Sequence, residues 1–213
     1  MSKHVEQGYT LLELLSVVVI IAVLVGIAVP SFRQSSLNSN IENRILEFKR
    51  TLVQARSAAV SRNAITTICR ANADGDGCGA NNGAWSSGWI AFVDDGGSVA
   101  GGVQGNGALD GDEELLISFT YDNADQYSVV LRDVDGSDAI PSLSFDNSGL
   151  LTLGTEAHVV VCEKGNDPTV SRGLNIFRTG RAVYSRDFDN DGKHDLQVGD
   201  GQGGVIKHDL TCG

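Results

Sequence analysis

The chain has 213 residues and a formal net charge of -11, from 16 Lys and Arg against 27 Asp and Glu. This length predicts one globular domain beside any membrane segment. The charge is uneven: residues 31–62 carry six basic and two acidic side chains, whereas residues 63–213 carry nine basic and twenty-three acidic ones. Because phosphate binding depends on positive charge, this balance disfavours non-specific nucleic-acid binding by the domain as a whole.

The stretch from Tyr9 to Val29 is almost entirely apolar, and Glu13 is its only charged residue. As a helix it would be about 30 Å long, enough to cross the hydrocarbon core of a bilayer. Such a run is too long for a buried core helix in a small acidic domain, so we predict a membrane segment over residues 9–30. Ionisable residues inside a membrane are costly, which makes Glu13 a functional candidate.

A leader, residues 1–8, precedes this segment and ends at Gly8. A secretory signal peptide would instead carry its small residue after the apolar run. Cleavage after Gly8 would leave an amine on Tyr9, one helical turn from Glu13. The same amine on a neighbouring subunit would neutralise Glu13 inside a packed bundle.

The segment Gly8–Leu14 closely resembles the class III signal of type IV pilins and type II secretion pseudopilins. The resemblance implies cleavage after Gly8 by a prepilin peptidase, N-methylation of Tyr9 and a role for Glu13 in filament assembly. It also implies partners among other major and minor pilins or pseudopilins. Before assembly the chain would cross the inner membrane once, with its domain in the periplasm. Pro30 falls where this family usually kinks its first helix.

A second helical pattern follows, with apolar residues spaced alternately by four and three. These residues are Ile41, Ile45, Phe48, Leu52, Ala55 and Ala59. The polar stretch Arg33–Asn40 before them has weak helix propensity. We therefore predict one long interrupted helix from about Thr10 to Arg62, whose amphipathic half, residues 31–62, packs on a sheet.

From Ile65 onwards, short β-rich runs alternate with Gly, Asp and Asn turns, which predicts antiparallel strands. The predicted strands are Ile65–Cys69, Trp89–Val93, Leu115–Phe119, Tyr127–Leu131, Leu143–Phe145, Val159–Cys162, Leu174–Phe177 and Ala182–Ser185. Thr179 and Gly180 predict a tight turn between the last two. The fold class is thus α+β, with a long N-terminal α-helix packed on an antiparallel β domain, residues 63–213.

Four cysteines lie beyond the membrane segment, and an even number in an exported domain predicts disulfides. We pair Cys69 with Cys78 and Cys162 with Cys212, one of the three connectivities that four cysteines allow. A zinc site is the alternative, but no Cys-x-x-Cys or His-x-His spacing supports it.

Residues 187–195 carry carboxylates at positions 1, 3, 5 and 9 and glycine at position 6. This spacing lets a tight loop wrap oxygen ligands around Ca²⁺, and it resembles the short DxDxDGxxD calcium loops of extracellular proteins. The candidate ligands are Asp187, Asp189, Asp191, Asp195 and the carbonyl of Lys193. Position 12 is Val198 and not the bidentate Glu of an EF-hand. The alternative is an acidic turn that binds no ion.

The Gly-rich segment 94–112 invites comparison with a nucleotide-binding loop. It lacks the Gly-Lys-Ser/Thr ending of a P-loop and no helix follows it, so we predict a flexible insertion. The histidines after the leader lie in no hydrolase or metalloprotease motif, and we predict no catalytic activity.

Several internal segments resemble the GspH/FimT-like pilin domain: Arg56–Asn63, Thr67–Cys69, Trp85–Asp94, Asp112–Leu116 and Phe177–Arg181. They imply a minor pilin or pseudopilin near a filament tip, with a helix packed on two sheets.

FimT-like competence pilins carry a Gly-Arg-x-Arg motif near the C-terminus. Here the sequence is Gly180-Arg181-Ala182-Val183, so the second arginine is missing. Arg178 and Arg181 remain candidate DNA contacts, and the alternative is that they pair with nearby acids. Three functions therefore stay open: a FimU/FimT-like minor type IV pilin that primes or caps the pilus, a DNA-binding competence pilin, and a GspH-like pseudopilin of type II secretion.

Overall fold

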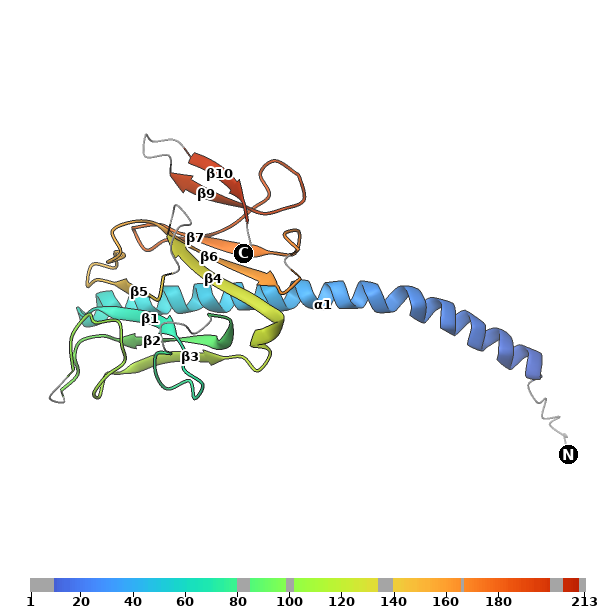
Figure 1. Cartoon of the computed structure of the whole chain (residues 1–213), viewed down its shortest axis with the longest axis horizontal. Coiled ribbons are helices and arrows are strands. Elements are labelled where there is room, and N and C mark those ends of the chain that lie inside the picture. The colour runs from blue at the N-terminus through green and yellow to red at the C-terminus, as the bar shows by residue number, and fades with distance from the viewer. Residues whose placement is uncertain are drawn as a thin grey trace, which may run out of the picture. The chain divides into compact units, whose positions relative to one another are not determined.

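The computed structural model describes residues 10–79, 85–98, 102–133, 140–165, 167–199 and 205–210. It begins with α1, one helix from Leu11 to Arg62, and continues into a β-rich region, which confirms the α+β class (Figure 1). The interruption that we predicted in this helix is wrong, because α1 is continuous through Pro30 and the polar stretch after it. A proline removes one backbone donor, and weak propensity alone does not end a helix.

The chain separates into two compact units, Met1–Ser39 and Asn40–Gly213. The boundary falls inside α1, whereas we placed the start of the globular domain at residue 63. The apolar stripe of the amphipathic half explains the difference. Its buried residues begin at Ile41 and belong to the core of the second unit.

Two four-stranded antiparallel sheets form the body of the second unit, with the C-terminal half of α1 between them (Figure 1). The first sheet has the order β3-β2-β1-β5, formed by Leu115–Thr120, Gly88–Val93, Thr66–Arg70 and Ser142–Phe145. The second has the order β4-β6-β7-β8, formed by Tyr127–Asp133, Ala157–Glu163, Arg172–Ile176 and Ala182–Tyr184. Short 3-10 helices at Trp85–Ser87 and Ala124–Gln126 precede β2 and β4. All eight strands lie where the sequence predicted them.

Phe48 of α1 lies in the main core, which contains residues of both sheets. Its ring meets Trp85 and Trp89 edge to face, at centroid distances of 5.8 and 5.0 Å. The indole N–H of Trp89 donates to Thr51 Oγ1 at 3.0 Å, so this polar group is satisfied inside the core. The helix stripe is therefore locked between the sheets by packing and by a buried hydrogen bond.

A separate two-stranded sheet was not predicted: β9, Asp195–Gly199, pairs antiparallel with β10, Val205–Asp209. Alternate residues of a strand face opposite sides of its sheet. Val159 and Val161 of β6 face the main core, so Val160 and Cys162 face away from it. The hairpin covers that outer face through a cluster of Val160, Cys162, Leu196 and Leu210.

Candidate functional site

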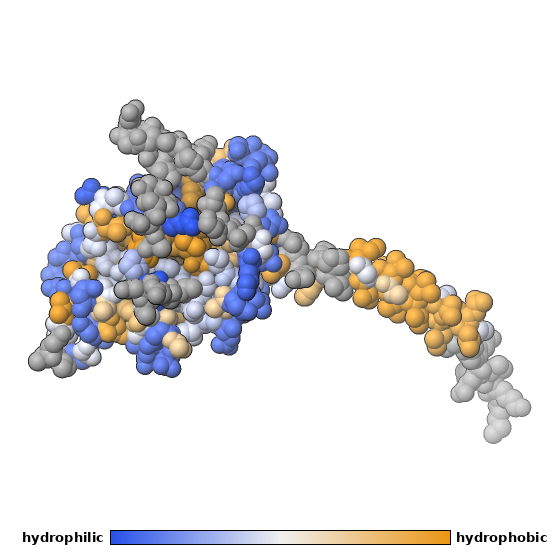
Figure 2. Space-filling view, viewed as in Figure 1, coloured by the Kyte–Doolittle hydropathy of each residue, from blue (hydrophilic) through white to orange (hydrophobic). Residues whose placement is uncertain are grey.

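The N-terminal unit presents a fully exposed apolar helix. The window Leu11–Ala28 has a mean hydropathy of 2.9 and none of it is buried, which makes it long and apolar enough to cross a membrane (Figure 2). Thr10 caps the helix, because its Oγ1 accepts a hydrogen bond from the Glu13 backbone N–H at 3.2 Å. Glu13 is thus exposed in the first turn of an apolar helix. Gly8 and Tyr9, the predicted processing residues, lie outside the described residues.

The predicted calcium loop brings three carboxylates together. One oxygen each from Asp187, Asp189 and Asp195 lie within 4.8 Å of one another. Two ligands that each bind Ca²⁺ at about 2.4 Å can be at most about 4.8 Å apart, so this spacing fits one cation. The loop is built by its own backbone: Asp187 accepts the N–H groups of Asn190 at 2.6 Å and of Gly192 at 3.0 Å.

Lys193 binds two other carboxylates at this loop. Its ammonium group donates to Asp191 at 2.9 Å and to Asp209 of β10 at 2.7 Å. The hydrogen bonds with Asp209 and Asp191 raise the pKa of Lys193 above its usual value. The bonds with Lys193 lower the pKa of Asp191. Asp191 therefore has a cationic partner already, and Asp209 joins this cluster from a strand that the sequence did not predict.

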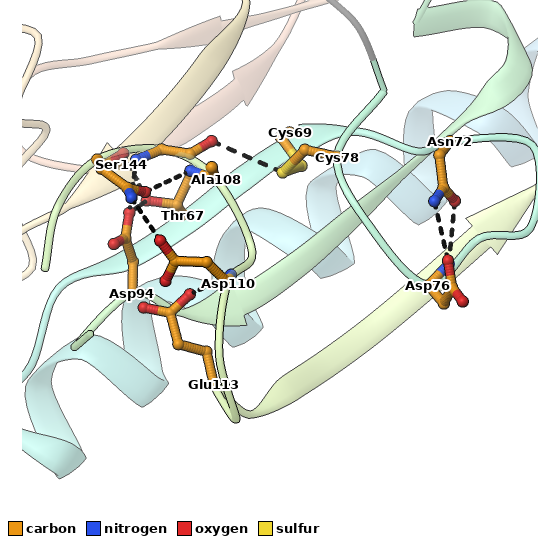
Figure 3. Close-up of a disulfide and its surroundings, with 12 residues drawn as sticks. Thr67, Cys69, Asn72, Asp76, Cys78, Asp94, Ala108, Asp110, Glu113 and Ser144 are labelled. Carbon is orange, nitrogen blue, oxygen red and sulfur yellow. Dashed lines mark hydrogen bonds between the residues drawn. A yellow bond between two sulfur atoms is a disulfide. The ribbon is translucent and has the colours of Figure 1, made fainter. Parts of the chain in front are cut away.

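The predicted Cys69–Cys78 disulfide is confirmed, and it closes the loop after β1 (Figure 3). Cys69 belongs to a small apolar cluster on the first sheet with Ile90 and Phe92. Cys162 is also disulfide-bonded. Cys212, its predicted partner, lies outside the described residues.

The Gly-rich segment that we expected to be a flexible insertion wraps around a buried carboxylate. Asp94 accepts the N–H of Gly105 at 2.6 Å, the N–H of Gly107 at 3.0 Å and the hydroxyl of Thr67 at 2.7 Å (Figure 3). Amides that a phosphate would need are thus bound by the chain's own carboxylate. The described part of this segment is a loop held to the domain by hydrogen bonds to Asp94.

Glu113 supports the same loop from its other end. Its carboxylate accepts the N–H groups of Gly96 at 2.8 Å and of Asp110 at 3.1 Å. Burial raises the pKa of Glu113, the hydrogen bonds from Asp110 and Gly96 oppose this, and the neighbouring charges of Asp94 and Asp110 add to the rise. This second buried carboxylate was not predicted, because its partners became evident only in the folded chain.

The predicted turn between β7 and β8 is confirmed, since the Gly180 N–H donates to Phe177 O at 2.8 Å. Gly180 has a φ of +75°, and a Cβ there would lie 2.6 Å from Gly149 O and 2.8 Å from Arg56 Nε. Glycine is therefore required at position 180, where the β7–β8 turn lies against Gly149 and Arg56. The neighbouring Arg178 and Arg181 are exposed, and in the described part of the chain neither side chain makes an ion pair.

Comparisons with known proteins agree with this architecture. Residues 45–180 match the family described as type II transport protein GspH, and residues 3–29 match the prokaryotic N-terminal methylation motif. No curated protein matches the sequence. The crystal structure of the type IV minor pilin FimU of Pseudomonas aeruginosa is similar, with a TM-score of 0.50 and 20% identity over 70% of this chain and 90% of that one. The minor pseudopilin EpsH of the Vibrio cholerae type II secretion system gives a TM-score of 0.48 and 10% identity, over 72% of this chain and 99% of that one.

Proposed function

The chain belongs to the GspH family of type II transport proteins, within the type IV pilin and pseudopilin superfamily, and we propose that it is a minor type IV pilin that helps prime or cap a pilus at its tip. It would be held in the bacterial inner membrane by residues 9–30, with its β-rich domain in the periplasm, until assembly moves it into the filament. The likeness to FimU concerns the fold. We favour the role of a minor pilin over other roles in the superfamily because FimU is described as a type IV minor pilin.

The single observation that carries membrane anchoring and assembly in this proposal is the exposed apolar helix with one acid near its start. Every residue of Leu11–Ala28 is exposed in the isolated chain. Burying such a surface in a bilayer, and then against the helices of other subunits, removes it from water at both stages. Glu13 then needs a cationic partner wherever it is buried. The N-terminal amine of a neighbouring subunit is the partner that we propose.

Processing would create that amine. The match to the N-terminal methylation motif spans residues 3–29 and therefore includes Gly8 and Tyr9. We propose that a prepilin peptidase cleaves after Gly8 and that Tyr9 is N-methylated. A methylated amine keeps its positive charge, so it still neutralises a carboxylate.

A calcium ion is a further proposed component. Asp187, Asp189 and Asp195 would supply its carboxylate ligands, because their oxygens lie within 4.8 Å of one another. Asp191 and Asp209 form a second such group with Asp189, but Lys193 already donates to both of them. The ion would bind β9 to the turn before it, since Asp195 begins that strand. Calcium would thus stabilise the C-terminal hairpin and take no part in chemistry, in keeping with a structural subunit.

DNA uptake is the less favoured alternative. Exposed Arg178 and Arg181 lie at the β7–β8 turn, and a phosphate backbone attracts such groups. The segment 63–213 nevertheless carries twenty-three acidic against nine basic side chains, and the second arginine of Gly-Arg-x-Arg is replaced by Val183. A gel shift with the purified chain at low salt, repeated with Arg181→Ala, tests this alternative. A salt-sensitive shift lost in the variant would favour DNA uptake over tip priming.

The main test is deletion of the gene in its native bacterium, followed by complementation. We expect few surface pili in the deletion strain, restoration by the wild-type chain, and poor restoration by Glu13→Gln. Glu42→Gln is the matched control, because Glu42 is an exposed acid on the same helix outside the apolar window. Pili of normal number and function in the deletion strain would refute the tip role. Loss of type II secretion with intact pili would instead identify a pseudopilin.

A further inference from the structure

An open groove runs along the exposed side of the C-terminal half of α1, with a volume of about 710 Å³. Its floor is one side of α1 from Leu46 to Arg62. Leu116 of β3 and Tyr184 of β8 form its two walls, and these strands are edges of the two sheets. We call this surface the α1 groove. All its residues lie in the unit Asn40–Gly213, so one folded body shapes it.

The α1 groove is apolar along its centre and basic at its rim. Val53 is 61% exposed and Tyr184 is 38% exposed, and both line the same groove as the exposed Leu46. The ammonium group of Lys49 lies 3.9 Å from the centroid of the Tyr184 ring. Arg50 is exposed and makes no ion pair in the described part of the chain.

Acidic side chains are absent from the described lining of the groove, although the chain has 27 Asp and Glu. Arg62 also lines it and forms an ion pair with Glu114 beyond the lining. The groove is therefore a local basic and apolar surface on an acidic protein. Such a surface complements a partner that is both acidic and partly apolar.

The edge of β3 is partly covered at this point. Gln54 of α1 donates from Nε2 to the carbonyl oxygen of Leu116 at 3.2 Å. A carbonyl that already accepts a side-chain donor is less available to an added strand. The occupant is thus expected to lie on the helix face through its side chains, and not to extend the sheet.

We propose that the α1 groove is the docking site for the acidic surface of a neighbouring pilin-type subunit. This inference rests on the proposed assembly function and adds the surface that receives the partner's domain. The chain's own segment 63–213 shows the required chemistry, because its net charge is -14. A groove on one subunit that binds a different surface on the next makes a head-to-tail contact, which is the kind of contact that joins a tip subunit to the next subunit of an open filament.

Nucleic acid is a poorer occupant. Phosphate groups gain from cations but not from an exposed Val53 and Leu46, whose apolar area would stay wet beneath a sugar-phosphate backbone. A protein surface can bury that area and still pair its carboxylates with Lys49 and Arg50. In protein interfaces a buried apolar centre is surrounded by a polar rim that is accessible to solvent.

The test places a photo-crosslinking amino acid at Val53 in the full-length chain, expressed in the native bacterium. A second position, Leu153, is the matched control, because it is exposed and apolar but lies outside the groove. We expect the Val53 variant to crosslink to a pilin-type subunit, through a peptide that carries Asp or Glu, as identified by mass spectrometry. Adding Arg50→Glu should reduce this adduct by about tenfold or more, whereas Arg50→Lys should retain it.

Incorporation into sheared filaments or pseudopili is measured on the same cultures. A chain that is absent from these fractions refutes the proposed function. A chain that is present, with no Val53 adduct above the Leu153 level, refutes the groove alone. An adduct with nucleic acid, or one that Arg50→Glu leaves unchanged, also overturns the groove proposal.

Discussion

The carboxylate of Asp94 and the hydroxyl of Thr67 form a hydrogen bond of 2.7 Å with both residues fully buried. The same hydroxyl lies 2.7 Å from Ser144 Oγ on β5. One polar chain therefore joins the loop after β2 to the two neighbouring strands β1 and β5. A buried carboxylate is tolerated here because three donors satisfy it.

Asp94→Asn should lower the free energy of unfolding by about 2–3 kcal/mol. The amide keeps one oxygen but puts an NH₂ group against backbone N–H donors, and a buried donor is left without an acceptor. Urea denaturation of the full chain in detergent measures this. Asp95→Asn is the control, because Asp95 is exposed and accepts one bond, from the Gly97 N–H. It should change stability by less than about 0.5 kcal/mol. Equal losses in the two variants would contradict the prediction.

Glu113 should make the loop sensitive to pH. Its folded pKa is raised above the unfolded value, chiefly by burial, so the folded state holds the proton more tightly. The stabilisation from this proton is present below the ordinary carboxyl pKa and is lost as pH rises through the folded pKa. Between pH 4 and pH 7, the Tm of the wild-type chain should therefore fall relative to the Tm of Glu113→Gln. A difference that is constant, or that shifts the other way, would exclude this role.

The Cys69–Cys78 disulfide closes a short loop, with a sequence separation of 9. Replacing both cysteines by serine should cost about 2–3 kcal/mol, because the unfolded chain regains the entropy that the bond removes. Urea unfolding of the double variant, beside the wild type, gives this value. A mild reductant that breaks this bond should lower the urea midpoint of the wild type toward that of the variant. The variant has no such bond to lose, so this bond cannot contribute to any change in its midpoint. Identical midpoints for the two oxidised proteins would show that the bond adds nothing.

The elements of the fold were predictable where periodicity is local. The spacing from Ile41 to Ala59 predicted the buried side of α1, and short β-rich runs between Gly, Asp and Asn turns predicted eight strands. The hairpin β9–β10 was missed because its two short strands follow Asp-rich and Gly-rich sequence. The alternation of Leu196 and Val198 was its available signal. Its packing also depends on β6, far away in the chain.

The supporting carboxylates were missed for a different reason. Asp94 is bound by Thr67, 27 residues earlier, and by amides of a loop that follows it. Sequence marks Asp94 as one more acid among many, because burial of a side chain is set by tertiary packing. An acid directly after a fully buried strand, followed by several glycines, is the pattern that would have suggested it. The α1 groove likewise exists only once two edge strands lie beside the helix.

The acidic cluster gives the last prediction, because the structure separates its members. Asp189 is exposed and accepts one bond, from Asp191 N–H at 3.2 Å, so Asp189→Asn should leave the fold intact. Calcium at ten times its dissociation constant stabilises a folded protein by about 1.4 kcal/mol, which is a measurable rise in Tm. We expect this rise when the full chain is moved from chelator to calcium, and its loss in Asp189→Asn. Asp209→Asn should keep most of it, since Lys193 binds Asp209. A Tm that is the same in calcium and in chelator would show that residues 187–195 are an acidic turn that binds no ion. A rise in Tm with calcium that survives Asp189→Asn would place the ion elsewhere.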